Sequence, residues 1–113
     1  MIAHSVATTA QSVGDGLRGI DVYRVWGNKS HPYGRSWTRV NPSDVKNYRD
    51  SAGLPDVNSG EYISHGRIID PSGIEITGAS PLDGNAGGLD ELIVPNSVKQ
   101  IELIGVHMPD NAL

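Results

Sequence analysis

The stretch that indicates the fold most clearly is DVYRVWGNKSHPYGRSWTRV, residues 21–40. β-Branched and aromatic side chains are concentrated in residues 22–26 and again in residues 36–40, and such side chains favour extended strands. Between them, residues 27–35 are polar and rich in turn-forming side chains. This stretch therefore predicts two strands connected by a long surface loop, which is a common place for a binding site.

The rest of the chain predicts further short strands and one main helix. Residues 41–53 predict that helix. Asn41 can cap its first turn, Pro42 suits the first helical position and Gly53 can close its end. The other predicted strands are 61–70, 74–77, 91–94 and 100–106. We therefore expect an α+β fold with a mostly antiparallel sheet or pair of sheets, and a glycine-rich loop over residues 78–88 that is not rigid by itself.

Length and composition limit the chain to one domain. At 113 residues and 37% hydrophobic content, it can bury a single modest core. The 14 glycines and 7 prolines favour short strands and turns over a helix bundle. Residues 1–20 are small and polar, so we expect a linker or arm there, followed by the folded domain at 21–113.

Charge and composition also exclude several classes of function. A formal net charge of −4 argues against nucleic acid or an anionic membrane as a partner. No apolar stretch approaches the roughly 20 residues of a membrane span, and residues 1–13 lack the pattern of a secretory signal. The chain has no cysteine, and His31, His65 and His107 lie in unrelated segments without ligand spacing, so we expect no metal site.

Three positions carry side chains that together suit cleavage of the nicotinamide–ribose bond of NAD. Arg24 lies in a predicted strand, and a guanidinium can bind two phosphate oxygens at once. Ser36 begins the next strand, and its hydroxyl can hold a carboxylate or a ribose hydroxyl. Glu91 begins a later strand, after Gly-Gly-Leu-Asp. Because the transition state of this cleavage is oxocarbenium-like, a carboxylate there can stabilise the positive charge on the sugar carbon.

The order of these residues resembles the Arg–Ser–Glu class of ADP-ribosyltransferases. VYRVWG matches the first motif at Arg24, SWT matches the second at Ser36, Trp37 and Thr38, and LDELIVP matches the third at Glu91. Over about residues 21–108 the chain is similar to the C-terminal toxin domains of bacterial Rhs proteins, in particular the TreTu-like toxins that ADP-ribosylate the translation factor EF-Tu.

The resemblance implies an ADP-ribosyltransferase-like fold, with two small sheets around an NAD cleft. It also implies that NAD is the substrate, that Glu91 is the catalytic glutamate, that Arg24 positions the NAD phosphates and that Ser36 orders the site. Trp37, Thr38 and Tyr48 are then expected to contribute to NAD binding. Trp37 suits a core position as well as a ring stacked on nicotinamide, and Tyr48 suits packing with its hydroxyl at the cleft.

Leu89 departs from the pattern of transferases that modify arginine. Those enzymes carry Glu or Gln at this position, so the resemblance puts an arginine acceptor in doubt. Strand alternation places Leu89 on the same side as Glu91, and we expect it to face the acceptor protein. Asp90 is expected to be the solvated neighbour of Glu91 on the acceptor-facing side. The GNAGG sequence at 84–88 precedes a strand and not a helix, so it also fits an acceptor-facing loop better than a phosphate loop.

The resemblance further implies a biological setting. It implies delivery by an Rhs carrier of the type VI secretion system, action in the cytoplasm of a target bacterium and neutralisation by a cognate immunity protein. Elongation factor Tu is the expected acceptor. Two alternatives stay open from the sequence. An NAD glycohydrolase toxin would use the same three residues to deplete NAD, whereas a non-enzymatic protein-binding module would consume none.

Overall fold

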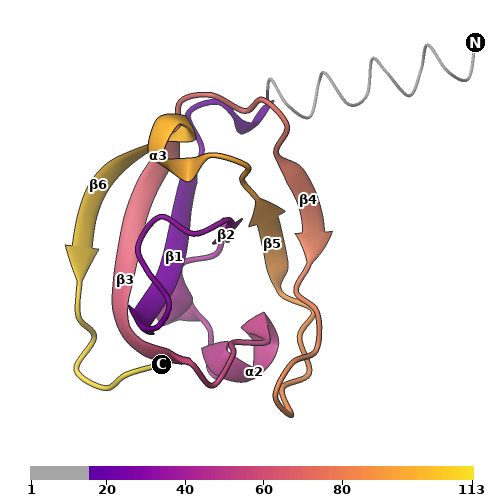
Figure 1. Ribbon diagram of the computed structural model, residues 1–113, viewed down its shortest axis with the longest axis vertical. Helices are drawn as coiled ribbons and strands as arrows, with labels where there is room; N and C mark the ends of the chain where they lie inside the picture. The colour runs from indigo at the N-terminus through magenta and orange to yellow at the C-terminus, as the bar shows by residue number, and fades with distance from the viewer. Residues whose placement is uncertain (1–15) are drawn as a thin grey trace, which may run out of the picture.

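The computed structural model describes residues 16–113, which form two three-stranded sheets (Figure 1). The first sheet has the order β1-β3-β6, from β1 (Asp21–Asn28), β3 (Asn58–Ile68) and β6 (Ile101–His107). The second sheet has the order β2-β5-β4, from β2 (Ser36–Trp37), β5 (Asp90–Ile93) and β4 (Glu75–Gly78). The strand pairs within both sheets are antiparallel. The predicted α+β class with a pair of antiparallel sheets is confirmed.

A hydrophobic cluster between the two sheets holds them together. It contains side chains from both sheets and from the segments beside them: Leu17, Val22, Trp37, Ile68, Leu92, Val94 and Ile101. Backbone hydrogen bonds also connect the sheets, because Tyr23 and Thr38 exchange N–H···O contacts of 2.8 and 2.9 Å. The sheets therefore meet where β1 passes the end of β2.

A second hydrophobic cluster lies where α2 (Tyr48–Ala52) packs on the first sheet. Its buried members are Val25, Tyr48, Leu54 and Ile63, and the half-buried Tyr23, Val45, Ala52, Leu89 and Leu113 pack against them. Because this second cluster includes Leu89, it joins α2 to the segment that leads into β5.

The predicted helix over residues 41–53 is wrong in its extent. The structure divides it into a 3-10 helix, η1 (Pro42–Asp44), and the short α2. The predicted ends are confirmed, because the Asn41 side chain accepts a hydrogen bond from the Ser43 amide and Gly53 closes α2 with φ of 57°. The break occurs because Asn47 caps a second helix start by accepting a hydrogen bond from the Asp50 amide, and such side-chain caps compete with a continuous helix.

Other boundaries also differ from the prediction. The second strand ends at Trp37, because the backbone of Thr38 pairs with Tyr23 of the other sheet and its hydroxyl accepts a hydrogen bond from the Val40 amide. β3 begins earlier than predicted, at Asn58. A short helix, α3 (Ser97–Gln100), precedes β6 and was not predicted. None of the helices within residues 16–113 is long and apolar enough to cross a membrane.

The folded domain begins before the predicted boundary at residue 21. Leu17 is 3% exposed and belongs to the cluster between the sheets. The Gly19 amide donates to the Ile68 carbonyl at 2.8 Å, and the Ile68 amide donates to the Ile20 carbonyl at 3.0 Å. Residues 17–20 therefore belong to the domain and not to a linker. Residues 1–15 of the predicted arm lie outside the described residues.

We predict that Gly53→Ala destabilises the protein by roughly 2 kcal/mol or more. Gly53 has a left-handed backbone, and a Cβ at this position would lie 2.1 Å from the Ser80 carbonyl oxygen. Urea unfolding of the purified variant measures the change. Gly105→Ala is the matched control, since a Cβ there meets nothing within 4 Å. Equal unfolding midpoints for the two variants would contradict the proposed close approach.

Candidate functional site

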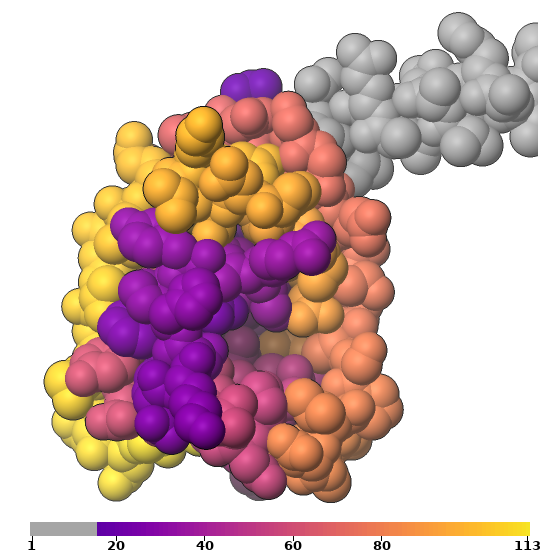
Figure 2. Space-filling view, in the orientation of Figure 1, coloured from indigo at the N-terminus to yellow at the C-terminus, as the bar shows by residue number. Residues whose placement is uncertain are grey.

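A pocket of about 680 Å³ opens between the two sheets, and α2 closes one side of it. Figure 2 shows the corresponding hollow between the violet early part of the chain and the orange late part. All eight side chains that the sequence predicted for the site line this one pocket: Arg24, Ser36, Trp37, Thr38, Tyr48, Leu89, Asp90 and Glu91. The fold therefore brings together residues that lie far apart in the sequence.

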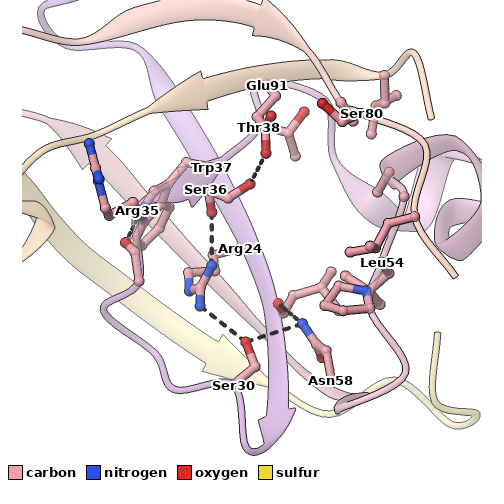
Figure 3. A pocket seen from close by; sticks show the side chains of 18 of the residues that line it. Arg24, Ser30, Arg35, Ser36, Trp37, Thr38, Leu54, Asn58, Ser80 and Glu91 are labelled. Carbon is pink, nitrogen blue, oxygen red and sulfur yellow. Dashed lines mark hydrogen bonds between the residues drawn. The ribbon is translucent and has the colours of Figure 1, made fainter.

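Ser36 and Glu91 come from adjacent antiparallel strands. Ser36 pairs with Ile93 and Trp37 pairs with Leu92, so Ser36 and Glu91 are diagonal neighbours across β2 and β5. Side chains in such positions can reach each other on one face of a sheet. The Ser36 hydroxyl donates a hydrogen bond to the Glu91 carboxylate (Figure 3). The register of the second sheet thus fixes the carboxylate at the pocket wall.

Arg24 extends from β1 and is tied to the loop and strand that follow it. Its Nε donates to the His31 carbonyl at 2.9 Å, one Nη donates to the Ser36 carbonyl at 3.0 Å, and the other donates to the Ser30 hydroxyl at 3.1 Å. Burial lowers the pKa of the Arg24 guanidinium, and the nearby Tyr48 opposes this effect. Arg24 is therefore a pocket residue whose side chain is held in place by three hydrogen bonds.

Ser36 links the two charged groups of the pocket. Its carbonyl oxygen accepts from Arg24, and its hydroxyl donates to Glu91, as Figure 3 shows. A displacement of Ser36 would therefore alter the positions of both the Arg24 and the Glu91 side chains.

Ser30 and Asn58 were missed by the sequence predictions. The buried Asn58 donates from Nδ2 to the Val25 carbonyl at 2.9 Å and to the Ser30 hydroxyl at 3.3 Å. Together with the contact from Arg24, these bonds anchor the loop at 27–35 to the floor of the pocket. A polar residue at the start of a strand is common, so only the fold reveals this contact between distant positions.

Trp37 and Thr38 line the pocket but expose little of their surface. Trp37 is 2% exposed, belongs to the cluster between the sheets, and donates from Nε1 to the Gly34 carbonyl at 2.9 Å. This placement favours its role in the core over a ring stacked on nicotinamide. Thr38 is also 2% exposed. A contribution of either residue to NAD binding stays a prediction.

Tyr48 is positioned by the first turn of α2 and packs in the second hydrophobic cluster. It is 7% exposed and lines the pocket together with Arg24 and Glu91. Burial raises the pKa of the Tyr48 hydroxyl to about 12, Arg24 opposes this shift and Glu91 adds to it. The hydroxyl is therefore neutral at physiological pH and can serve as a hydrogen-bond donor at the pocket.

Asp90 is not the solvated neighbour that the sequence predicted. The Arg39 side chain forms a two-pronged ion pair with it, including an Nε–Oδ2 distance of 3.0 Å, and the Arg39 amide donates to the same oxygen at 3.2 Å. The hydrogen bonds from the Arg39 side chain lower the pKa of Asp90, against the opposing effect of burial. This ion pair adds a contact between the segment that follows β2 and the first residue of β5. It therefore fixes the position of the residue next to Glu91.

Leu89 lies on the same pocket as Glu91, as strand alternation predicted, but it also has a packing role. It is half-buried against the second hydrophobic cluster, and its amide donates to the Ser51 carbonyl at 3.0 Å. Its predicted contact with an acceptor protein stays a prediction.

Two carboxylates and two arginines are among the residues that line the pocket. Because Arg39 neutralises Asp90, the lining carboxylate without a paired cation among residues 16–113 is Glu91, and Arg24 and Arg35 are the lining arginines. Arg35 was not predicted, since it lies in a loop without a motif. The same part of the chain holds no cluster of three metal-ligating side chains. Comparisons with protein-family models, with curated proteins and with solved structures found no match.

We predict that Arg39→Ala lowers the free energy of unfolding by about 0.5–1 kcal/mol at pH 7, as for a partly exposed ion pair. Because the pKa of Asp90 is lower in the folded than in the unfolded chain, the pair stabilises the fold above about pH 4. This contribution is lost as the pH falls through the lowered value. Urea unfolding at several pH values measures it, with the exposed Lys46→Ala as control. A loss for Arg39→Ala that does not shrink in acid would rule out this account.

Proposed function

We propose that this protein is a mono-ADP-ribosyltransferase toxin domain that transfers ADP-ribose from NAD to a bacterial protein, elongation factor Tu. The observation that carries the proposal is the chain of contacts from Arg24 through Ser36 to Glu91 in one pocket. The motifs of the Arg–Ser–Glu class name these three residues. Their contact in space supports the resemblance. Three short motifs that matched by chance would not be expected to place their residues in one pocket.

The size of the pocket and its position between the sheets also fit the proposal. Ligand pockets typically have volumes of about 300–1,000 Å³, and this one has about 680 Å³. The resemblance implies two small sheets around a cleft, and the domain has two three-stranded antiparallel sheets around this pocket. We therefore assign this fold to the domain as part of the proposal.

Glu91 is the residue that acts at the reacting centre. When the bond between the ribose C1′ and the nicotinamide nitrogen breaks, the electron pair leaves with nicotinamide and the ribose becomes an oxocarbenium ion. The Glu91 carboxylate binds the ribose 2′-hydroxyl and stabilises the positive charge. The acceptor nucleophile then forms a bond to C1′ and releases its proton to solvent. Ser36 holds the carboxylate in place for this step.

Arg24 binds the phosphates of NAD with the N–H groups that remain beyond its three contacts within the protein. A guanidinium suits this role because it offers donors in a planar fork. Its contacts with the loop at 27–35 and with Ser36 hold the side chain in one orientation.

The biological setting follows from the resemblance to Rhs toxin domains. An Rhs carrier of the type VI secretion system delivers the domain into the cytoplasm of a target bacterium. Modification of elongation factor Tu there blocks translation, and a cognate immunity protein protects the producing cell.

Incubation of the purified protein with labelled NAD and a bacterial lysate tests the proposal. Transfer to elongation factor Tu would appear as one labelled protein band of its size. Free labelled ADP-ribose without a labelled protein would mean that the domain is an NAD glycohydrolase. Untouched NAD would mean that it is a binding module, and either result would overturn the transferase assignment.

We predict that Glu91→Gln lowers turnover by about 100-fold or more, because the amide keeps the shape but loses the charge that stabilises the oxocarbenium ion. Binding of NAD should largely remain, which isothermal titration calorimetry measures. Asp90→Asn serves as the comparison at the neighbouring carboxylate. Nearly normal turnover by folded Glu91→Gln, together with an inactive Asp90→Asn, would show that Asp90, and not Glu91, is the catalytic carboxylate.

We predict that Arg24→Lys weakens NAD binding by about tenfold, although the charge is kept, because an ammonium lacks the planar fork. The loss also removes contacts to the loop at 27–35. Calorimetry with NAD measures the affinity, and circular dichroism checks the fold. Arg18→Lys is the matched control, since Arg18 is outside the pocket lining and donates to the Ile69 carbonyl at 2.7 Å. Parent-like affinity of Arg24→Lys would show that Arg24 has only a structural role.

A further inference from the structure

Residues 79–89, here called the hairpin tip, continue the β4–β5 hairpin beyond its named strands. The Ala79 amide donates to the Leu89 carbonyl and the Gly88 amide donates to the Ala79 carbonyl, both at 2.8 Å. Leu82 and Asn85 pair across a tight turn. The sequence predicted a loop without rigidity of its own, so the ordered tip needs an external support.

That support is the C-terminal end of α2, beside which the hairpin tip lies in Figure 1. Asp50 accepts two hydrogen bonds from the tip: its carboxylate accepts one from the Ala86 amide at 2.9 Å, and its backbone carbonyl accepts one from the Gly87 amide at 2.8 Å. The backbone carbonyl of the next residue, Ser51, accepts a hydrogen bond from the Leu89 amide at 3.0 Å. Further along the chain, Asn85 donates to the Leu54 carbonyl at 3.0 Å.

The backbone of the hairpin tip shows why an anchor is needed. Gly84, Gly87 and Gly88 have φ of 81°, 76° and 98°. Glycine samples many backbone conformations in the absence of contacts, so holding three of them in the left-handed region carries a large entropic cost. A carboxylate that accepts a hydrogen bond from a backbone amide is a strong partner and can offset part of this cost.

We propose that Asp50 is a positioning residue that holds the hairpin tip in a preformed shape for the protein acceptor. This inference rests on the proposed function, in which the tip faces the acceptor. Leu82 of the tip is 46% exposed and lines the pocket, and the tip leads directly to Glu91. A surface that is already ordered loses less conformational entropy when a partner binds. Asp50 itself does not line the pocket, so any effect on the acceptor is exerted through the tip and not through a contact of Asp50 with NAD.

The test compares Asp50→Ala, which removes the side-chain acceptor, with Asp50→Asn, whose amide oxygen can still accept from Ala86. Asp44→Ala is the control for loss of an exposed carboxylate near a helix start. Three quantities are measured for each folded variant: hydrogen exchange of the tip amides, hydrolysis of labelled NAD without an acceptor, and labelling of purified elongation factor Tu.

For Asp50→Ala we expect exchange at the Ala86 amide, which loses its side-chain acceptor, to accelerate by about tenfold, while amides of β3 stay as in the parent. Labelling of the acceptor should fall by about tenfold, whereas hydrolysis of NAD should stay within about twofold. Asp50→Asn should restore both exchange and labelling close to the parent values. Asp44→Ala should change neither.

Unchanged tip exchange in Asp50→Ala, unchanged labelling, or an equal loss of labelling and hydrolysis would each overturn the inference. Failure of the proposed function looks different, because the parent itself would then leave NAD or elongation factor Tu untouched. In that case the exchange measurement still decides whether Asp50 holds the hairpin tip.

Discussion

The pairing of Trp37 in β2 with Leu92 in β5 is the contact on which the rest of the structure depends. Trp37 is 2% exposed and Leu92 is 0% exposed, and both pack against the first sheet. Since side chains alternate along a strand, a slip of one residue would turn both side chains away from the core. The same register brings Ser36 to Glu91. Hydrophobic burial, and not any polar contact within the pocket, therefore determines where the catalytic candidate lies.

Local patterns in the sequence predicted those parts of the fold that depend on neighbouring residues. Strand propensity located β1 and β5, and capping chemistry located Asn41 and Gly53 as the ends of the helical region. The same reasoning missed the break at Asn47. Asn41 and Asn47 are both possible helix caps within one short segment, and only the packing of Tyr48 determines that both are used. Propensity is a weak prior where tertiary contacts compete with it.

The candidate site was predictable as a set of residues but not as a set of contacts. The motifs named the residues that line the pocket, whereas the partners of those residues could not be read from spacing. Arg39 reaches Asp90, and Asp50 reaches Ala86, across long intervals of sequence. Such pairs form because the fold brings the segments together, and a single sequence has no local signal for them. Consequently, the residues that orient the site are less visible in the sequence than those that would touch a substrate.

The exchange of backbone hydrogen bonds between Tyr23 and Thr38 has a consequence for how the pocket responds to a ligand. Each sheet is internally braced by its own ladder, whereas this isolated bridge is the backbone contact between β1 and the end of β2. A single bridge can act as a hinge, because the angle between the two sheets can change while the ladders within each sheet stay intact. We expect adjustment of the cleft to occur as a change in the angle between the sheets, with the pairing within each sheet preserved.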